Sequence, residues 1–171
     1  MTTFEIIGQI LGGVAIILGF ASYQMKTQDK LIFVHTLTTF VFVLQYLFMG
    51  AIPGMALNIV SMIRGIVYYF RNKKGSNDKI TPIIFAVLMG ITGIITWDNW
   101  YSVFIFLALI INTLCMSLSD PQKVRISLLV TCPLALIYDA LLPVPAVTAI
   151  VFELFSITSA IIGLVRNKKK A

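Results

Sequence analysis

The chain is built from apolar segments of about 20 residues, separated by short breaks that contain charged residues, glycine or proline. A helix rises about 1.5 Å per residue, so such a segment crosses the roughly 30 Å hydrocarbon core of a bilayer. A transmembrane β-barrel would instead show alternating segments of about 10 residues, and these runs do not alternate. Of 171 residues, 58% are hydrophobic and only 12% are charged, whereas about a quarter are charged in soluble domains. The sequence therefore predicts an all-α integral membrane protein.

The breaks divide the chain into seven predicted transmembrane helices. Two of the breaks, GAIPG at 50–54 and LLPVP at 141–145, are short proline turns, and the other four carry charges or turn residues. No soluble domain fits between them. The predicted helices are 4–23, 31–50, 53–71, 80–97, 99–118, 123–142 and 145–165.

The distribution of Lys and Arg predicts the orientation in the membrane. With seven helices, the connections after the first, third and fifth helices and the C-terminal tail lie on one side. They hold every Lys and Arg of the chain except Arg64. Because cytoplasmic loops are enriched in basic residues, the N-terminus is predicted outside and the C-terminus in the cytoplasm. The net charge of +6 then requires no nucleic acid, and the expected partner of the basic loops is the anionic surface of the bilayer.

A four-residue basic sequence occurs twice in the chain, and an internal repeat explains its recurrence. The letters RNKK at 71–74 return at 166–169, and the same shift of 95 residues places Asn58 on Glu153. Each three-helix unit then reads as helix, basic loop, helix, proline turn, helix and basic end, and a single helix between two such units keeps them parallel. The predicted parts are a first three-helix bundle at 1–74, a linker helix at 75–98 and a second three-helix bundle at 99–171.

This 3+1+3 arrangement resembles the SWEET sugar transporters and the wider PQ-loop superfamily, whose repeats are related by an axis along the membrane normal. The stretch LGFASYQMKTQDKLIFVHTL is similar to the motif at the end of the superfamily's first helix, with Gln24 in place of its Gln and Tyr23 in place of its Pro. PGMALN at 53–58 is similar to the segment that carries the substrate-facing Asn of bacterial half-SWEETs. The resemblance implies a gating or hinge role for Tyr23 and Gln24, and a solute site at Asn58.

Over almost its full length the chain also resembles a bacterial inner-membrane family called YgjV. The shared features are the run GFxSYQMKTQxKLxF and the segment from PGMALN to RNKKG. This resemblance implies a multi-pass protein of the bacterial inner membrane.

Ionisable residues inside the predicted helices are candidates for function, because placing a charge in hydrocarbon costs several kcal/mol. Arg64 lies roughly 10 Å from the cytoplasmic end of its helix, so it either snorkels to the interface or is paired within a central cavity. Glu153 is expected to face a polar cavity, and Asp139, nearer the outer end of its helix, is expected at the interface. His35 is the single histidine, which either titrates near neutral pH or is hydrogen-bonded to a neighbour. Glu153, His35 and Asp139 are the candidates for proton coupling.

The third and seventh helices each have one small and polar face, because polar residues recur there every three or four positions. If the two units pack with these helices inward, the two faces meet across a central cavity. The predicted substrate-binding residues are Asn58, Ser61, Arg64, Glu153, Ser156, Gln45 and Asn112.

The first helix and the two cysteines are predicted to serve packing. Gly8, Gly12, Ala15 and Gly19 form a small-residue stripe that allows a neighbouring helix to approach closely. Cys115 and Cys132 lie inside apolar segments, where they act as small packing residues.

Two classes of function fit these features. The sequence has no glycine-rich phosphate loop, no second histidine and no Ser-His-Asp pattern, so we expect no enzyme, no cofactor and no metal site. The first class is a facilitative or ion-coupled transporter of an unidentified small solute, with Asn58, Arg64 and Glu153 lining one cavity. The second is a non-transporting receptor, lipid-handling or assembly protein, in which Arg64 and Glu153 form a closed ion pair or point outward. A homo-oligomer is compatible with both classes.

Overall fold

The computed structural model describes residues 2–25, 27–76, 78–118 and 121–168. Within these residues the chain forms seven α-helices and no strand, which confirms the predicted all-α class and number of helices. The helices are α1 (Thr3–Gln24), α2 (Gln28–Phe48), α3 (Ile52–Lys73), α4 (Ile80–Ile95), α5 (Ser102–Met116), α6 (Pro121–Leu141) and α7 (Val147–Lys168).

The observed bounds differ from the predicted ones by at most three residues, and one such departure is at α5, which begins at Ser102 and not at residue 99. Residues 99–101 form tight turns instead, because the Ser102 N–H donates to the Asn99 carbonyl at 2.9 Å. By length and composition, α1, α2, α3, α6 and α7 can each cross a membrane. The apolar helices α4 and α5 have only 16 and 15 residues, so each is roughly 22–24 Å long.

Local sequence signals fix the connection between α3 and α4. Gly75 has a φ of 66°, a conformation that glycine adopts without strain, and it turns the chain after α3. Asp78 then accepts hydrogen bonds from the backbone N–H groups of Ile80 at 2.8 Å and Thr81 at 3.0 Å. The Thr81 hydroxyl and these two N–H groups hold the pKa of Asp78 below its usual value.

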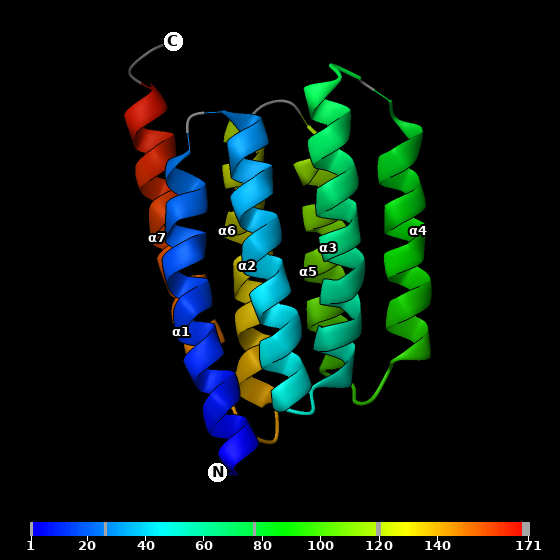
Figure 1. Ribbon diagram of the computed structural model, residues 1–171, viewed down its shortest axis with the longest axis vertical. Coiled ribbons are helices and arrows are strands. Elements are labelled where there is room, and N and C mark those ends of the chain that lie inside the picture. The colour runs from blue at the N-terminus through cyan, green and yellow to red at the C-terminus, as the bar shows by residue number, and fades with distance from the viewer. Residues whose placement is uncertain (1, 26, 77, 119–120, 169–171) are drawn as a thin grey trace.

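Six helices pack in a closed ring in the order α1, α2, α3, α5, α6, α7, and α7 returns to α1. In Figure 1, α1, α2 and α3 lie in front of α7, α6 and α5. α4 lies outside this ring, against α3 and α5. The three helices of each predicted unit lie in a row, and the closest packing between the two units is that of α1 with α7 and of α3 with α5. The space inside the ring is therefore bounded by helices of both units.

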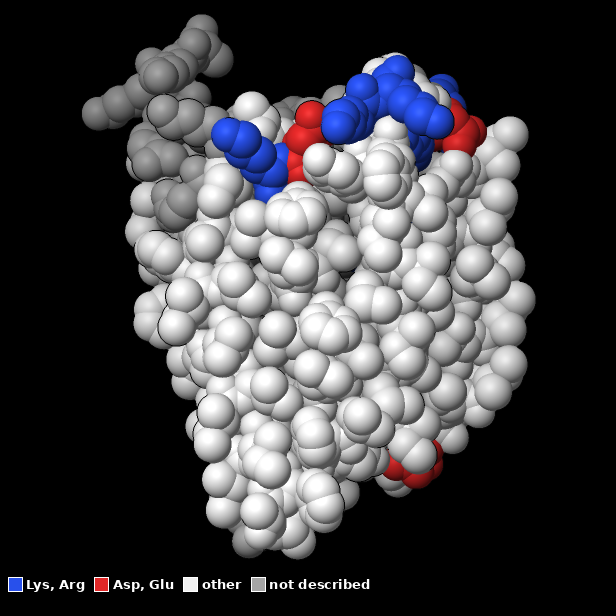
Figure 2. Space-filling model, viewed as in Figure 1, with Lys and Arg blue, Asp and Glu red and all other residues white. Residues whose placement is uncertain are grey.

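The outer surface of the ring is apolar. Ile10, Ile17, Ile94 and Ile95 are 65%, 72%, 72% and 76% exposed, an arrangement that soluble monomers avoid over large areas. Figure 2 shows Lys and Arg gathered with some acidic residues at one end of the molecule, an uncharged middle, and a small acidic patch at the opposite end. The surface thus matches a hydrocarbon layer bounded on one side by a basic face.

The predicted small-residue stripe brings α1 close to both of its neighbours. A Cβ atom on Gly12 would collide with Thr148 of α7 and would lie 2.7 Å from the Gln45 Oε1 atom of α2. A Cβ atom on Gly19 would collide with the ring of Phe152 on α7. The packing role predicted for this stripe is confirmed at these positions.

Candidate functional site

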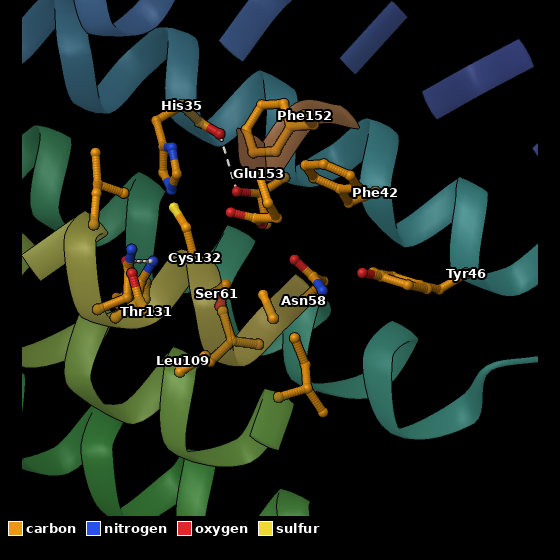
Figure 3. Close-up of a pocket in the computed structure, with 17 residues that line it drawn as sticks. His35, Phe42, Tyr46, Asn58, Ser61, Leu109, Thr131, Cys132, Phe152 and Glu153 are labelled. Carbon is orange, nitrogen blue, oxygen red and sulfur yellow. Dashed lines mark hydrogen bonds between the residues drawn. The ribbon is translucent and has the colours of Figure 1, made fainter. Parts of the chain in front are cut away.

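A cavity of about 60 Å³ lies inside the ring, with room for a few water molecules. Five helices line it, α2, α3, α5, α6 and α7, and Figure 3 shows their side chains around a common space. The polar residues of the lining are His35, Thr39, Tyr46, Asn58, Ser61, Arg64, Asn112, Thr131, Cys132 and Glu153.

α3 and α7 contribute residues at matching positions of the two units. Both helices have 22 residues, and the bounds of α7 are those of α3 shifted by 95. Asn58 and Glu153, which this shift pairs, both line the cavity. Ser61 also lines it, whereas its counterpart Ser156 is buried elsewhere.

α2 and α6 also contribute matching positions, but at a shift of 93. Both have 21 residues, and the connection from α6 to α7 is two residues longer than that from α2 to α3. The shift pairs three lining residues of α2 with three lining residues of α6. The pairs are His35 with Leu128, Thr39 with Cys132, and Phe42 with Ala135.

Arg64 lies in the interior and does not snorkel, since its side chain is 1% exposed. Its Nη1 atom donates to the Thr113 hydroxyl at 2.6 Å, and Nη2 donates to the Asn112 amide oxygen at 3.3 Å. The Tyr68 hydroxyl donates to the Thr113 carbonyl at 3.1 Å. These bonds join α3 to α5 and therefore join the two units. The Arg64 Nε atom is buried and has no partner in the described part of the chain.

Glu153 enters the cavity from α7 beside Phe152 and Phe42 (Figure 3). The Cys132 thiol of α6 lies beside its carboxyl group. Among the described residues it forms no ion pair with Arg64, although both side chains line the same cavity. Cys132, predicted as a packing residue, is thus also part of the polar lining.

Tyr46, which lines the cavity, is bonded to Asp139 outside the lining. The Tyr46 hydroxyl donates to Asp139 Oδ1 at 2.7 Å, and the same shift of 93 pairs these two residues. Asp139 is 0% exposed and lies two residues before the end of α6, so Tyr46 holds its carboxyl group inside the protein near this end of the helix. Its interfacial depth in the membrane stays a prediction. Beside this contact the Gly54 N–H donates to the Tyr138 hydroxyl at 3.1 Å.

The cavity brings together six of the predicted site residues, His35, Asn58, Ser61, Arg64, Asn112 and Glu153. Gln45 lies outside it, where Nε2 donates to the Thr148 hydroxyl at 3.1 Å. Ser156 and Asp139 also lie outside the lining. The side chains of Tyr23 and Gln24 lie outside the part of the chain that is described.

The sequence interpretation missed Tyr46, Thr131 and Thr113. Tyr46 and Thr131 line the cavity, and Thr113 holds Arg64. An alignment of the two units with a gap of two residues between the middle and last helices would have paired Tyr46 with Asp139. In the residues that the structure describes, no three His, Cys, Asp or Glu side chains approach closely enough to hold a metal ion.

Comparison with known proteins identifies the family. No curated protein and no solved structure matches the chain. A family model described as a bacterial inner membrane protein, Imp-YgjV, matches residues 6–171, and this description agrees with the apolar helices and with the basic face at one end. The chain therefore belongs to the Imp-YgjV family and is a multi-pass protein of the bacterial inner membrane.

Proposed function

We propose that this protein is a small-solute transporter of the alternating-access type, with its site in the cavity between two parallel three-helix units. α4 is the linker that keeps the units parallel, the N-terminus is outside, and the basic face is cytoplasmic. The solute would pass by facilitated diffusion or by coupling to an ion, with Glu153 and His35 as the titratable groups of the cavity. The protein would need neither an enzymatic activity nor a cofactor for this function.

The observation that carries the proposal is that matched positions of both units line one polar cavity. The pairs on α2 and α6, together with Asn58 and Glu153, face the same space. The two closest packings between the units, α1 with α7 and α5 with α3, are also exchanged by the repeat. A site at the interface of two related units becomes open to either side when one unit tilts against the other.

The hydrogen bonds at the Tyr46 end of the cavity support the same proposal. Tyr46 with Asp139 and Gly54 with Tyr138 each join helices of different units. Both contacts lie near the ends of α2 and α6 that are remote from the basic face, which the proposed orientation makes the outer end. Breaking these two contacts would open the cavity to the outside.

A receptor or assembly protein with the same helices would require Arg64 and Glu153 to pair with each other or to point outward. Neither arrangement is present, since Arg64 is bonded to α5 and Glu153 faces the cavity. The burial of Arg64 and the position of Glu153 in the cavity wall therefore favour the transporter.

The test is the accessibility of residue 61 from the two sides of the membrane. In a background with Cys115→Ser and Cys132→Ser, the Ser61→Cys variant is labelled in right-side-out and inside-out vesicles with a membrane-impermeant maleimide. A transporter exposes this position to each side in turn, so labelling from both sides is expected.

Ser156→Cys is the matched control, because Ser156 occupies the equivalent position of α7, is equally buried at 2% exposure, and lies outside the cavity. It should remain unlabelled from either side. Protection of Ser61→Cys from both sides would contradict alternating access and would favour a static membrane protein.

A further inference from the structure

We infer that the ligand of the central cavity presents a primary ammonium group, which binds between the Glu153 carboxylate and the oxygen atoms of Asn58 and Ser61. This inference rests on the proposed function and names the class of solute.

The first argument is the charge of Glu153. A carboxylate withdrawn from water needs a cation or several strong donors to compensate it. No described Lys or Arg forms an ion pair with Glu153, and the Cys132 thiol beside it is only a weak hydrogen-bond donor. A buried carboxyl group without a partner takes up a proton, so a ligand that keeps Glu153 ionised must supply a cation from the cavity side, where Glu153 forms part of the wall.

The second argument is the set of acceptor atoms on the facing wall. The Asn58 Nδ2 atom donates to the Gly54 carbonyl at 2.8 Å, which leaves the Asn58 amide oxygen for the cavity (Figure 3). The Ser61 hydroxyl oxygen is buried, lines the cavity and has no hydrogen-bond partner in the described structure. An ammonium group has three donors and no acceptor, so it matches one carboxylate and two such oxygen atoms.

The third argument is the aromatic wall around Glu153. The rings of Phe42 and Phe152 lie edge to face with centroids 4.8 Å apart, and both line the cavity. Aromatic faces attract ammonium groups and offer nothing to an anion. A neutral sugar would find stacking surfaces here but no use for the carboxylate charge.

The charge of Arg64 does not reverse this preference. Asn112 and Thr113 hold its terminal nitrogen atoms on the α5 side. Arg64 also lies six residues beyond Asn58 along α3, which is about 9 Å. The volume of about 60 Å³ further favours a group of few atoms.

The experiment is isothermal titration of the detergent-purified full chain with methylammonium chloride, with glycine and glucose in separate titrations. The Glu153→Gln variant keeps the size of the side chain and removes its charge. Asp98→Asn is the matched control, because Asp98 is an exposed carboxylate in the connection between α4 and α5. We expect methylammonium to bind the wild type and Asp98→Asn equally, and Glu153→Gln at least 10-fold more weakly.

If Glu153→Gln does not fold, a second measurement uses the wild type. Methylammonium should slow the alkylation of Cys132 by N-ethylmaleimide at least threefold, because the ligand would lie against the carboxyl group that the thiol contacts. Tighter binding of glycine with the same dependence on Glu153 would assign the ammonium group to an amino acid, whereas binding of methylammonium alone would assign it to a free amine.

Absence of methylammonium binding, without protection of Cys132, would overturn the inference, and so would equal binding to Glu153→Gln. If glucose then binds and Asn58→Ala abolishes that binding, the transporter proposal stands and only the ammonium group is wrong. If Ser61→Cys is in addition unlabelled from both sides, the proposed function itself fails.

Discussion

Replacing Tyr46 by Phe should open the outer end of the cavity. The substitution keeps the ring and removes the hydroxyl group that donates to Asp139 at 2.7 Å. The other oxygen of this carboxyl group, Oδ2, already has no partner in the described structure, and Asp139 is 0% exposed. The variant therefore leaves a fully buried carboxyl group without a side-chain donor whenever the outer end is closed.

Leaving a buried acceptor unsatisfied costs about 1–3 kcal/mol. The cost applies to the closed state alone, since water can hydrate Asp139 once the end is open. A value of about 2 kcal/mol shifts the equilibrium between closed and open states about 30-fold towards the open state.

The assay is the rate at which an impermeant maleimide labels Ser61→Cys from the outside, in the background without Cys115 and Cys132. The rate should rise about 30-fold with Tyr46→Phe as long as the open state remains the minor one. Tyr101→Phe is the control, because its hydroxyl accepts only an exposed hydrogen bond from Asn99. An unchanged rate in a Tyr46→Phe variant that purifies and melts like the parent would refute the assignment of this contact as a closure.

Three further predictions concern stability. Arg64→Lys should lower the free energy of unfolding by about 2 kcal/mol and the Tm by about 4–8 °C. The reason is that one ammonium group cannot bond both Thr113 and Asn112 as the guanidinium group does. An unchanged Tm would contradict this prediction. Gly12→Ala should destabilise the protein by about 1–3 kcal/mol through overpacking, whereas Gly13→Ala, with open space around its Cβ position, should be neutral or stabilising in the same thermal unfolding assay. The pKa of Asp78 is lowered in the folded state. Its contribution to the free energy of unfolding should therefore be complete at pH values above the ordinary pKa of Asp, and should disappear as the pH falls through the pKa of the folded state. Thermal unfolding curves of the wild type and Asp78→Asn should therefore converge at low pH, and a gap independent of pH would exclude this explanation.

The positions of the helices could be predicted from the sequence because apolar segments and their breaks are local properties. The errors fell at the ends, as at α5, where turn hydrogen bonds around Asn99 replaced the first helical turn. The shift of 95 paired Asn58 with Glu153, and the structure places both in one cavity. The same shift could not pair Tyr46 with Asp139, because the two units differ by two residues in the connection before the last helix.

The interpretation of single polar residues needed the neighbours that only the tertiary structure supplies. Periodicity predicted that Ser61 and Ser156 lie on equivalent faces of their helices. In the structure only Ser61 reaches the cavity. The neighbour of α3, which is α5, lines the cavity, whereas the neighbour of α7, which is α1, packs through its glycines and does not line it. The sequence allowed the Arg64 side chain to snorkel to the interface. Its buried position depends on hydrogen-bond acceptors that lie 48 and 49 residues away in the chain.

The sequence by itself determined that this protein lies in a membrane as seven helices, since hydropathy over about 20 residues is a local transfer free energy. The distribution of basic residues likewise predicted one basic face, and Lys and Arg gather at one end in Figure 2. The tertiary structure decided which polar groups share the cavity and which are bonded elsewhere. That choice depends on helix rotation and on contacts such as Tyr46 with Asp139, and these arise only when distant segments pack against one another.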